Sequence, residues 1–268
     1  MIVNLEPLLP HLPAWLLVLV RISGIFMLAP LFGSQTIPAR VKALLAFGLS
    51  LCVYPTLLDA ARPSAALIAP VLTGGLSLWT LLPAAATELM IGLVIGYGAS
   101  LPLMAMQIGG RVADQQLGFG LGGVFNPDLD EQSGVIGEFF FIAALGIFIL
   151  LGGHRVMMDT LVGSFQSVPL GGFRPDGQLL ELLVGLLTAM FELTLRVAGP
   201  LLCLIFLETV AMGFIARTVP QMNILSIGFP LRILLGVAFL TAALATQGEA
   251  FVEAVQNTLR DLSTFFGT

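Results

Sequence analysis

The sequence predicts an all-α membrane protein built from kinked helical hairpins. The chain has 268 residues, of which 57% are hydrophobic and only 10% are charged, whereas ordinary soluble domains carry about 25% charged residues. A soluble domain of this length cannot hide so much apolar surface, so lipid or other apolar helices must cover it. No low-complexity linker divides the chain, and we therefore expect one helical domain over residues 1–268.

A series of apolar stretches forms the predicted helices, and most approach the roughly 20 residues that a helix needs to cross a bilayer. In chain order they are Leu12–Phe32, Val41–Leu58, Ala65–Pro83, Leu89–Met106, Val135–Gly152, Leu179–Pro200, Leu201–Ala216 and Ile224–Thr246. Proline or glycine interrupts nearly all of them, and a proline inside a helix removes a backbone hydrogen bond and kinks it. Because freed backbone groups at membrane depth must be buried in protein or line a wet cavity, we expect broken helices packed together.

Two amphipathic segments accompany the apolar stretches. The first is a polar helix in which one face carries Gln107, Arg111, Asp114 and Gln115. The second, at 249–266, has an apolar stripe of Phe251, Val255, Leu259, Leu262 and Phe266 opposite Glu253, Gln256, Asn257, Arg260 and Asp261. The stripe predicts a helix that lies at the membrane interface or packs on a partner, and the sequence does not separate these two.

Six charged residues lie within or beside the apolar stretches, where each costs about 2.5–3.5 kcal/mol at a bilayer centre. They are Arg21, Glu138, Glu192, Arg196, Glu208 and Arg232. The i,i+4 spacing of Glu192 and Arg196 allows them to pair on one helix face. The other four need partners on other helices of this chain or on other chains, and both possibilities stay open.

A polar turn is expected between two apolar helices near residue 220. It contains Arg217, Pro220, Gln221 and Asn223. Such a turn can be capped by its own side chains, or it can present a contact for another protein.

Several functions find no support in the sequence. The net charge is −5 and Lys42 is the sole lysine, so nucleic acid is not an expected partner. No metal-ligand spacing and no nucleophile with a base are present, so we predict no catalytic residue, no metal and no cofactor. His154 and Asp159 are five positions apart and do not share a helix face well. No basic residue precedes the first apolar stretch, and a cleaved signal peptide is not expected.

A glycine-rich loop is predicted over 114–133, between two helices. Its candidate functional part is Gln115, Gln116, Leu117, Gly118, Phe119, Gly120, Leu121, Gly122, Gly123, Val124 and Phe125. Three of the glycines spell a dinucleotide fingerprint, but that motif needs a strand before it and a helix after it, and here a polar helix precedes it and Asn126-Pro127 follows. A plain connecting loop is one interpretation, although this loop is long and apolar for that role. A plug is the other, because apolar contacts exclude water and glycine permits the backbone to change shape.

Sequence blocks along nearly the whole chain, in order, carry a resemblance to a known family. They are Arg21–Gly33, Ile37–Ala46, Gly153-His154, Ser164–Gly171, Arg217–Asn223 and Gly228–Gly236, with Gln116–Pro127 matching the family's loop. The chain resembles FliR, the R subunit of the flagellar type III secretion export gate, and the injectisome counterparts are similar in outline.

The resemblance implies a hairpin architecture inside a hetero-oligomeric helical export gate. There the R subunit joins P and Q subunits and other membrane export components around a closed pore, through which unfolded flagellar proteins leave the cytoplasm. It also implies a place in the bacterial inner membrane and flagellar basal body, contact with membrane lipid, and a plug role for the glycine-rich loop. A secondary transporter with broken helices is the alternative, although neither half of the chain convincingly repeats the other.

Overall fold

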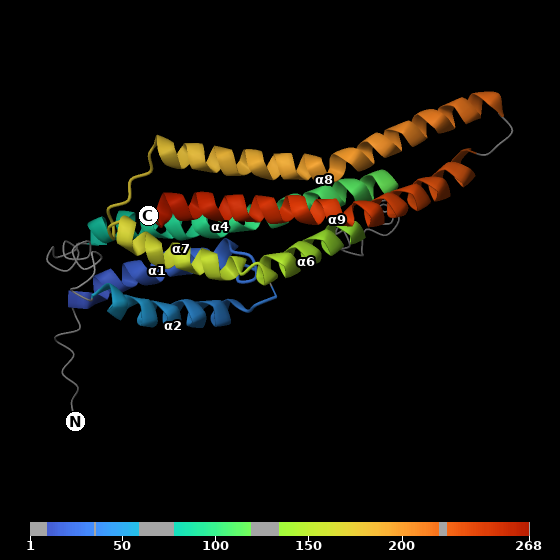
Figure 1. The fold of residues 1–268 in the computed structure, drawn as a ribbon. Helices are drawn as coiled ribbons and strands as arrows, with labels where there is room; N and C mark the ends of the chain where they lie inside the picture. The colour runs from blue at the N-terminus through green and yellow to red at the C-terminus, as the bar shows by residue number, and fades with distance from the viewer. Residues whose placement is uncertain (1–9, 35, 59–77, 119–133, 220–223, 268) are drawn as a thin grey trace. The chain divides into compact units, whose positions relative to one another are not determined.

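A computed structural model describes residues 10–34, 36–58, 78–118, 134–219 and 224–267. In these ranges every regular element is a helix and no strand occurs, which confirms the all-α prediction (Figure 1). The helices are α1 (Leu12–Leu28), α2 (Ala39–Leu57), α4 (Leu78–Leu117), α6 (Val135–Leu150), α7 (Gly153–Ser167), α8 (Gly177–Thr218) and α9 (Ile224–Phe266). The predicted apolar stretch Ala65–Pro83 falls mostly outside the described residues.

Local sequence explains where several helices end. Helix α1 ends at Leu28, and the following Ala29 is extended with ψ 147° because Pro30 disfavours a helical residue before it. Gly152 separates α6 from α7 with a φ of +70°, a conformation that glycine adopts without steric cost.

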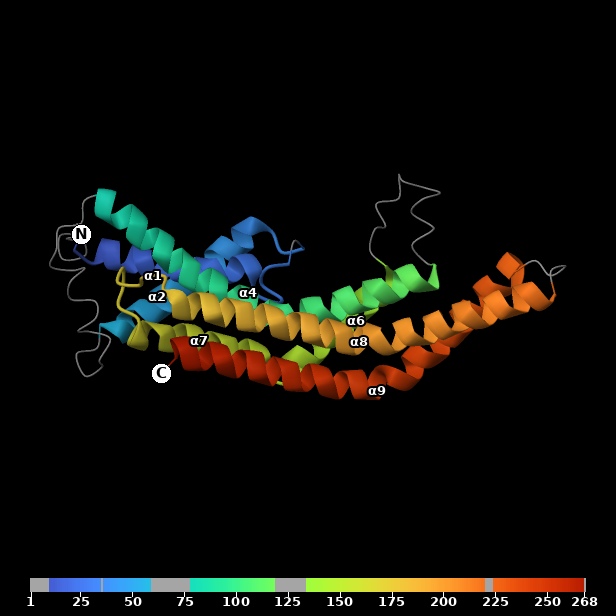
Figure 2. The ribbon, with the colours of Figure 1, turned by 90° about the horizontal axis from the view of Figure 1, so that it is seen from above.

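Two of the prolines that were expected to interrupt apolar stretches, Pro200 and Pro230, lie inside helices. The stretches on either side of Pro200 form the single helix α8, and Pro230 lies inside α9, which also includes the predicted C-terminal helix. Figure 2 shows both as long helices, and α9 bends by 55° between Ala242 and Gln247. Proline is tolerated in long membrane helices because neighbouring groups and local adjustment satisfy the backbone groups that it frees.

The chain divides into two compact units. Unit 1 contains Met1–Ser100, Gly152–Leu186 and Gln256–Thr268, and unit 2 contains Leu101–Leu151 and Leu187–Val255. Helices α4, α8 and α9 each contribute residues to both units.

In unit 1, α1 packs against both α2 and α4. Glycines bring α1 and α4 together: a Cβ atom at Gly24 would lie 2.7 Å from the Leu89 carbonyl oxygen, and one at Gly96 would lie 3.1 Å from the Ile25 carbonyl oxygen. Small residues of this kind let helix backbones approach closely inside membranes.

The C-terminal part of α9 contains the segment expected to be amphipathic. The residues of its apolar stripe are all buried, and those of the opposite face are exposed. In unit 1, Leu262 lies against Gly98, and the Phe266 ring contacts Phe173. The stripe therefore packs within this chain.

The helices are apolar and long enough for a membrane protein. Three of the described helices can cross a bilayer by length and composition, Ala39–Leu57, Trp79–Leu117 and Gly177–Thr218, and the number rises to five if two bent helix pairs each count as one span. Large apolar side chains are exposed on α8, among them Phe191, Leu195, Phe206, Leu207 and Phe214. This surface requires lipid or partner helices to cover it.

Candidate functional site

The structure describes the base of the glycine-rich loop. Gln115, Gln116 and Leu117 form the last turn of α4 and Gly118 follows them, whereas Phe119–Phe125 lie outside the described residues, as does the rest of the loop to residue 133. We use the name loop anchor for Gly110, Asp114, Leu117, Gly118 and Gly137, which belong to unit 2.

Asp114 joins the two ends of the loop. Its side chain, in a residue that is only 2% exposed, accepts the backbone N–H of Ile136 at 3.1 Å through Oδ1 and that of Gly137 at 2.9 Å through Oδ2. These two N–H groups lie in the first turn of α6, where a helix offers no backbone partner. The residue before α6 is Gly134, which has no side chain to cap the helix. Asp114 supplies the cap instead, and its negative charge suits the helix N-terminus.

The two helices that flank the loop meet at backbone distance. A Cβ atom at Gly110 of α4 would lie 2.7 Å from the Gly137 Cα atom of α6, and one at Gly137 would lie 3.1 Å from the Arg111 backbone nitrogen. Glycine at both positions permits this approach, which brings the Asp114 carboxylate within reach of α6.

The loop leaves α4 against α9. Leu117 is fully buried, and a Cβ atom at Gly236 of α9 would lie 2.9 Å from Leu117 Cδ1. Gly118 has a φ of +85°, and a Cβ atom there would lie 2.5 Å from Phe229 Cε2. The backbone conformation and the small space both require glycine, so the direction of the chain is fixed at Gly118, the residue that follows α4.

The predicted polar face of α4 needs a correction. Arg111 and Gln115 are exposed and Gln107 is half-buried, but Asp114 is turned into the protein. Sequence reasoning missed its capping role because its partners lie 22 and 23 positions further along the chain. The available signal was the position of Asp114, an acidic residue in the last turns of the helix before the loop. Glu138 is exposed, and Gln107 Nε2 donates to its Oε2 at 3.4 Å.

Arg21 is fully buried in unit 1 and its partners lie in this chain. Nε donates to Glu88 Oε2 at 2.5 Å, and Nη1 donates to the Ser164 carbonyl oxygen at 2.9 Å and to its hydroxyl at 3.1 Å. Nη2 donates to the Val168 carbonyl oxygen at 3.4 Å, and the guanidinium carbon lies 4.3 Å from the centre of the Phe165 ring. The charge is thus paired and hydrogen-bonded, as burial demands.

Glu88 completes this cluster and was missed by sequence reasoning. Its Oε1 accepts the Gly171 backbone N–H at 2.8 Å, so the Arg21–Glu88 pair ties α1 to α4, to α7 and to the turn after α7. The available signal was an acid directly before the apolar stretch Leu89–Met106.

Glu208 and Arg232 also pair within the chain. Arg232 donates to Glu208 Oε2 from Nε at 3.1 Å and from Nη2 at 2.9 Å, and Nη2 also donates to the Thr209 hydroxyl at 2.9 Å. These contacts join α8 to α9 in unit 2. Glu208 is buried, and the Arg232 side chain keeps 31% of its surface exposed.

The helix-face pair suggested by spacing does not form. Arg196 lies 3.6 Å from Glu253 of α9, with 57% and 65% of the two side chains exposed, and Glu192 is exposed nearby on α8. An exposed arginine can pair with acids on its own helix or on a neighbouring helix. Spacing along the sequence identifies only the acids on its own helix.

The remaining predicted sites are described only in part. Arg217 is exposed in the last turn of α8, whereas Pro220, Gln221 and Asn223 lie outside the described residues. Asp159 is exposed and His154 is half-buried. Within the described ranges, no three His, Cys, Asp or Glu side chains gather closely enough to hold a metal ion.

Comparison with known proteins gives a consistent result. A family model described as "Bacterial export proteins, family 1" matches residues 12–258. The chain is 32% identical over 224 residues to the flagellar biosynthetic protein FliR of Bacillus subtilis, covering 82% of each chain. It is 28% identical to FliR of Aquifex aeolicus, covering 84% of this chain and 82% of the relative. It is 25% identical to FliR of Escherichia coli K12, covering 84% and 81%.

The helical fold and these matches define a membrane protein of a bacterial export family. Within that class, the chain belongs to the FliR family of flagellar biosynthetic proteins. It is a component of the flagellar export apparatus, in the bacterial inner membrane at the flagellar basal body.

Proposed function

We propose that this chain is a core subunit of the flagellar export gate, where it joins P and Q subunits around a closed pore for unfolded flagellar proteins. In this proposal the loop over 114–133 is the plug. The observation that carries it is the loop anchor, in which Asp114 holds the start of α6 against the end of α4. A plug must stay in place while its tip changes shape, and a loop with joined ends and a glycine-rich middle has both properties.

The composition of the loop supports the same role. Its apolar side chains favour a dry environment, and its glycines allow a second conformation when substrate passes. The exit at Gly118 is fixed by its left-handed backbone and by the Phe229 ring beside it. Movement would therefore begin after Gly118, while α4 and α6 stay in place.

The exposed apolar surface supports assembly with other subunits. Phe206, Leu207 and Phe214 of α8 are each about two-thirds exposed in the single chain, which exceeds what a stable lone protein normally leaves uncovered. P and Q subunits would cover part of this surface and lipid the rest. We further propose that the polar turn with Arg217, Gln221 and Asn223 is capped by its own side chains, and that residues 1–268 act as one functional domain.

Native mass spectrometry of the co-expressed complex tests the proposal. The chain is produced with the proteins of its genomic neighbourhood and extracted in mild detergent. We expect one copy of this chain inside a large mixed assembly. A stable lone monomer or homodimer that retains no partner would contradict the gate and favour a transporter.

A further inference from the structure

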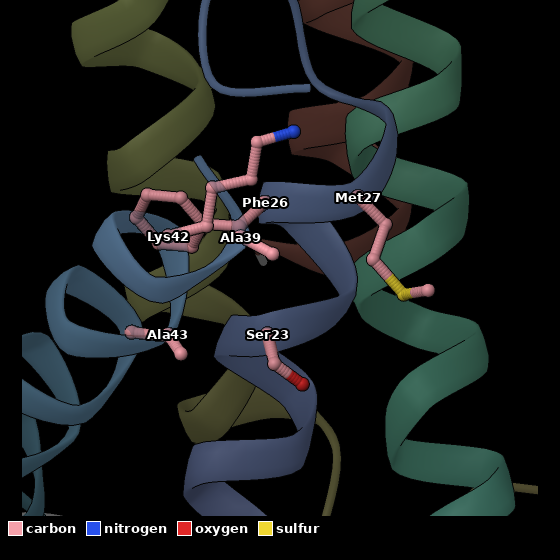
Figure 3. A pocket seen from close by; sticks show the side chains of 7 residues that line it. Ser23, Phe26, Met27, Ala39, Lys42 and Ala43 are labelled. Atoms are coloured by element: carbon pink, nitrogen blue, oxygen red, sulfur yellow. The ribbon is translucent and has the colours of Figure 1, made fainter. Parts of the chain in front are cut away.

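A groove between α1 and α2 carries a cation, Lys42, at its edge. It has a volume of about 370 Å³ and is lined by Ser23, Phe26 and Met27 of α1 and by Ala39, Lys42, Ala43 and Ala46 of α2. Figure 3 shows Phe26 of α1 and Ala39, Lys42 and Ala43 of α2 where the two helices face each other, whereas Met27 lies on the α4 side of α1. The volume lies at the lower end of the range for small-molecule sites, and the lining is apolar apart from Ser23 and Lys42.

Among the residues that line the groove, Lys42 is the charged one. Its side chain is half-buried, which suits a lysine whose apolar stem covers the groove while its ammonium group reaches outward. Within the described residues, Lys42 and the neighbouring exposed Arg40 form no ion pair. The Ser23 hydroxyl already donates to the Val20 carbonyl oxygen at 2.8 Å.

Acidic residues are scarce in the described parts of α1, α2 and α4 that belong to unit 1. From Leu12 to Leu57 the sequence contains no Asp or Glu. On α4 the acid of unit 1 is Glu88, which Arg21 already binds. The α1–α2 hairpin therefore carries a net positive charge at the end where α2 begins, in a chain whose overall charge is −5.

The groove lies beside a helix that is suited to contact lipid. Helix α2 is long and apolar enough to span a bilayer, and it exposes Leu44, Leu45 and Leu51 along its length. Basic residues at the end of such a helix lie where phospholipid headgroups lie. An acyl chain in the groove would meet the same apolar environment that covers the rest of α2.

We propose that the α1–α2 groove binds one anionic phospholipid. Its phosphate contacts the Lys42 ammonium group, and one acyl chain lies against Ala39, Ala43 and the edge of Phe26. The inference needs only a membrane location for α2, so it stands apart from the plug.

Lipid titration of the purified full-length protein tests the site. The protein is delipidated in mild detergent and titrated with phosphatidylglycerol or with phosphatidylcholine of the same acyl chains, and retained lipid is counted by native mass spectrometry. We expect one phosphatidylglycerol to be retained in preference to phosphatidylcholine. Lys42→Ala should weaken retention by about fivefold, the effect of one surface cation on an anionic lipid. Lys42→Arg keeps the charge and should keep the lipid.

Matched substitutions separate the groove from general charge and bulk. Arg155→Ala removes an exposed cation from α7 and should have no effect. Ala43→Trp fills the groove and should abolish retention, whereas Leu44→Trp adds the same ring to the neighbouring, 70% exposed position and should not. Equal retention of both lipids, or unchanged retention in Lys42→Ala or Ala43→Trp, would overturn the proposal.

Discussion

The Asp114 carboxylate and the backbone N–H of Gly137 lie 2.9 Å apart, across a loop that separates them by 23 positions. This bond, with its companion to Ile136, makes the end of one helix the cap of the next. The loop between them is the segment that we propose closes the pore. The two ends of this loop are therefore held together by a helix cap, and single substitutions can weaken that cap.

Replacing Asp114 with alanine should loosen this base. The substitution removes both acceptors and leaves the buried Gly137 N–H without a partner, at a cost of about 1–3 kcal/mol. Asp114→Asn keeps one acceptor oxygen and should lie between alanine and the wild type. Thermal unfolding of the purified chain measures the effect, and an alanine variant as stable as the wild type would show that the cap contributes nothing.

Adding a methyl group at Gly110 should separate α4 from α6. The Cβ of Gly110→Ala would meet Gly137 backbone atoms, which cannot move aside as a flexible side chain would. We expect lower yield of the assembled complex and a lower unfolding temperature. Gly146→Ala is the control. Gly146 lies on α6, as Gly137 does, but a Cβ atom at Gly146 would meet nothing within 4 Å. Equal behaviour of the two variants would contradict the close contact.

Breaking the Arg21–Glu88 pair should destabilise the chain severely. Arg21→Met leaves the Glu88 carboxylate buried without its cation, at a cost of about 3–5 kcal/mol. Adding Glu88→Leu removes the stranded charge, so the double variant should recover part of the stability. Arg196→Ala breaks an exposed pair and should cost about 0–1 kcal/mol. Comparable losses in Arg21→Met and Arg196→Ala would show that burial of the pair is unimportant.

Charge loss at Glu208 or Arg232 should weaken assembly by distorting the α8–α9 hairpin. Because the two side chains bind each other, Glu208→Gln and Arg232→Gln should not add up in the double variant. Co-purification with the other export components gives the measurement. Normal recovery of both single variants would remove any role in assembly, and fully additive losses would point to separate partners.

The fold could be predicted from composition and periodicity, but the partners of the charged groups could not. The α9 stripe from Phe251 to Phe266 was readable because its residues repeat at the helical period. The sequence predicted that Arg21 needs a partner, because an unpaired charge in an apolar stretch costs free energy. It did not predict which partner, because Glu88 lies 67 positions away and no local pattern links the two residues.

Sequence alone did not predict how far the helices continue through proline. Pro200 and Pro230 forbid one backbone hydrogen bond each, yet α8 and α9 continue through them. A helix of 42 residues keeps its remaining hydrogen bonds on both sides, and sequence rules for short soluble helices do not include that support. The partners of Asp114 could not be predicted, because its hydrogen bonds connect two helices that are separated by a long loop.

The plug is tested most directly by deleting Gly118–Gly123 and measuring leakage of ions or small solutes through the inner membrane of cells that express the gate. Complex recovery by native mass spectrometry ensures that the shortened chain still assembles. We predict an assembled gate that leaks, because the segment that closes the pore is gone. An assembled gate with unchanged leakage would contradict the plug.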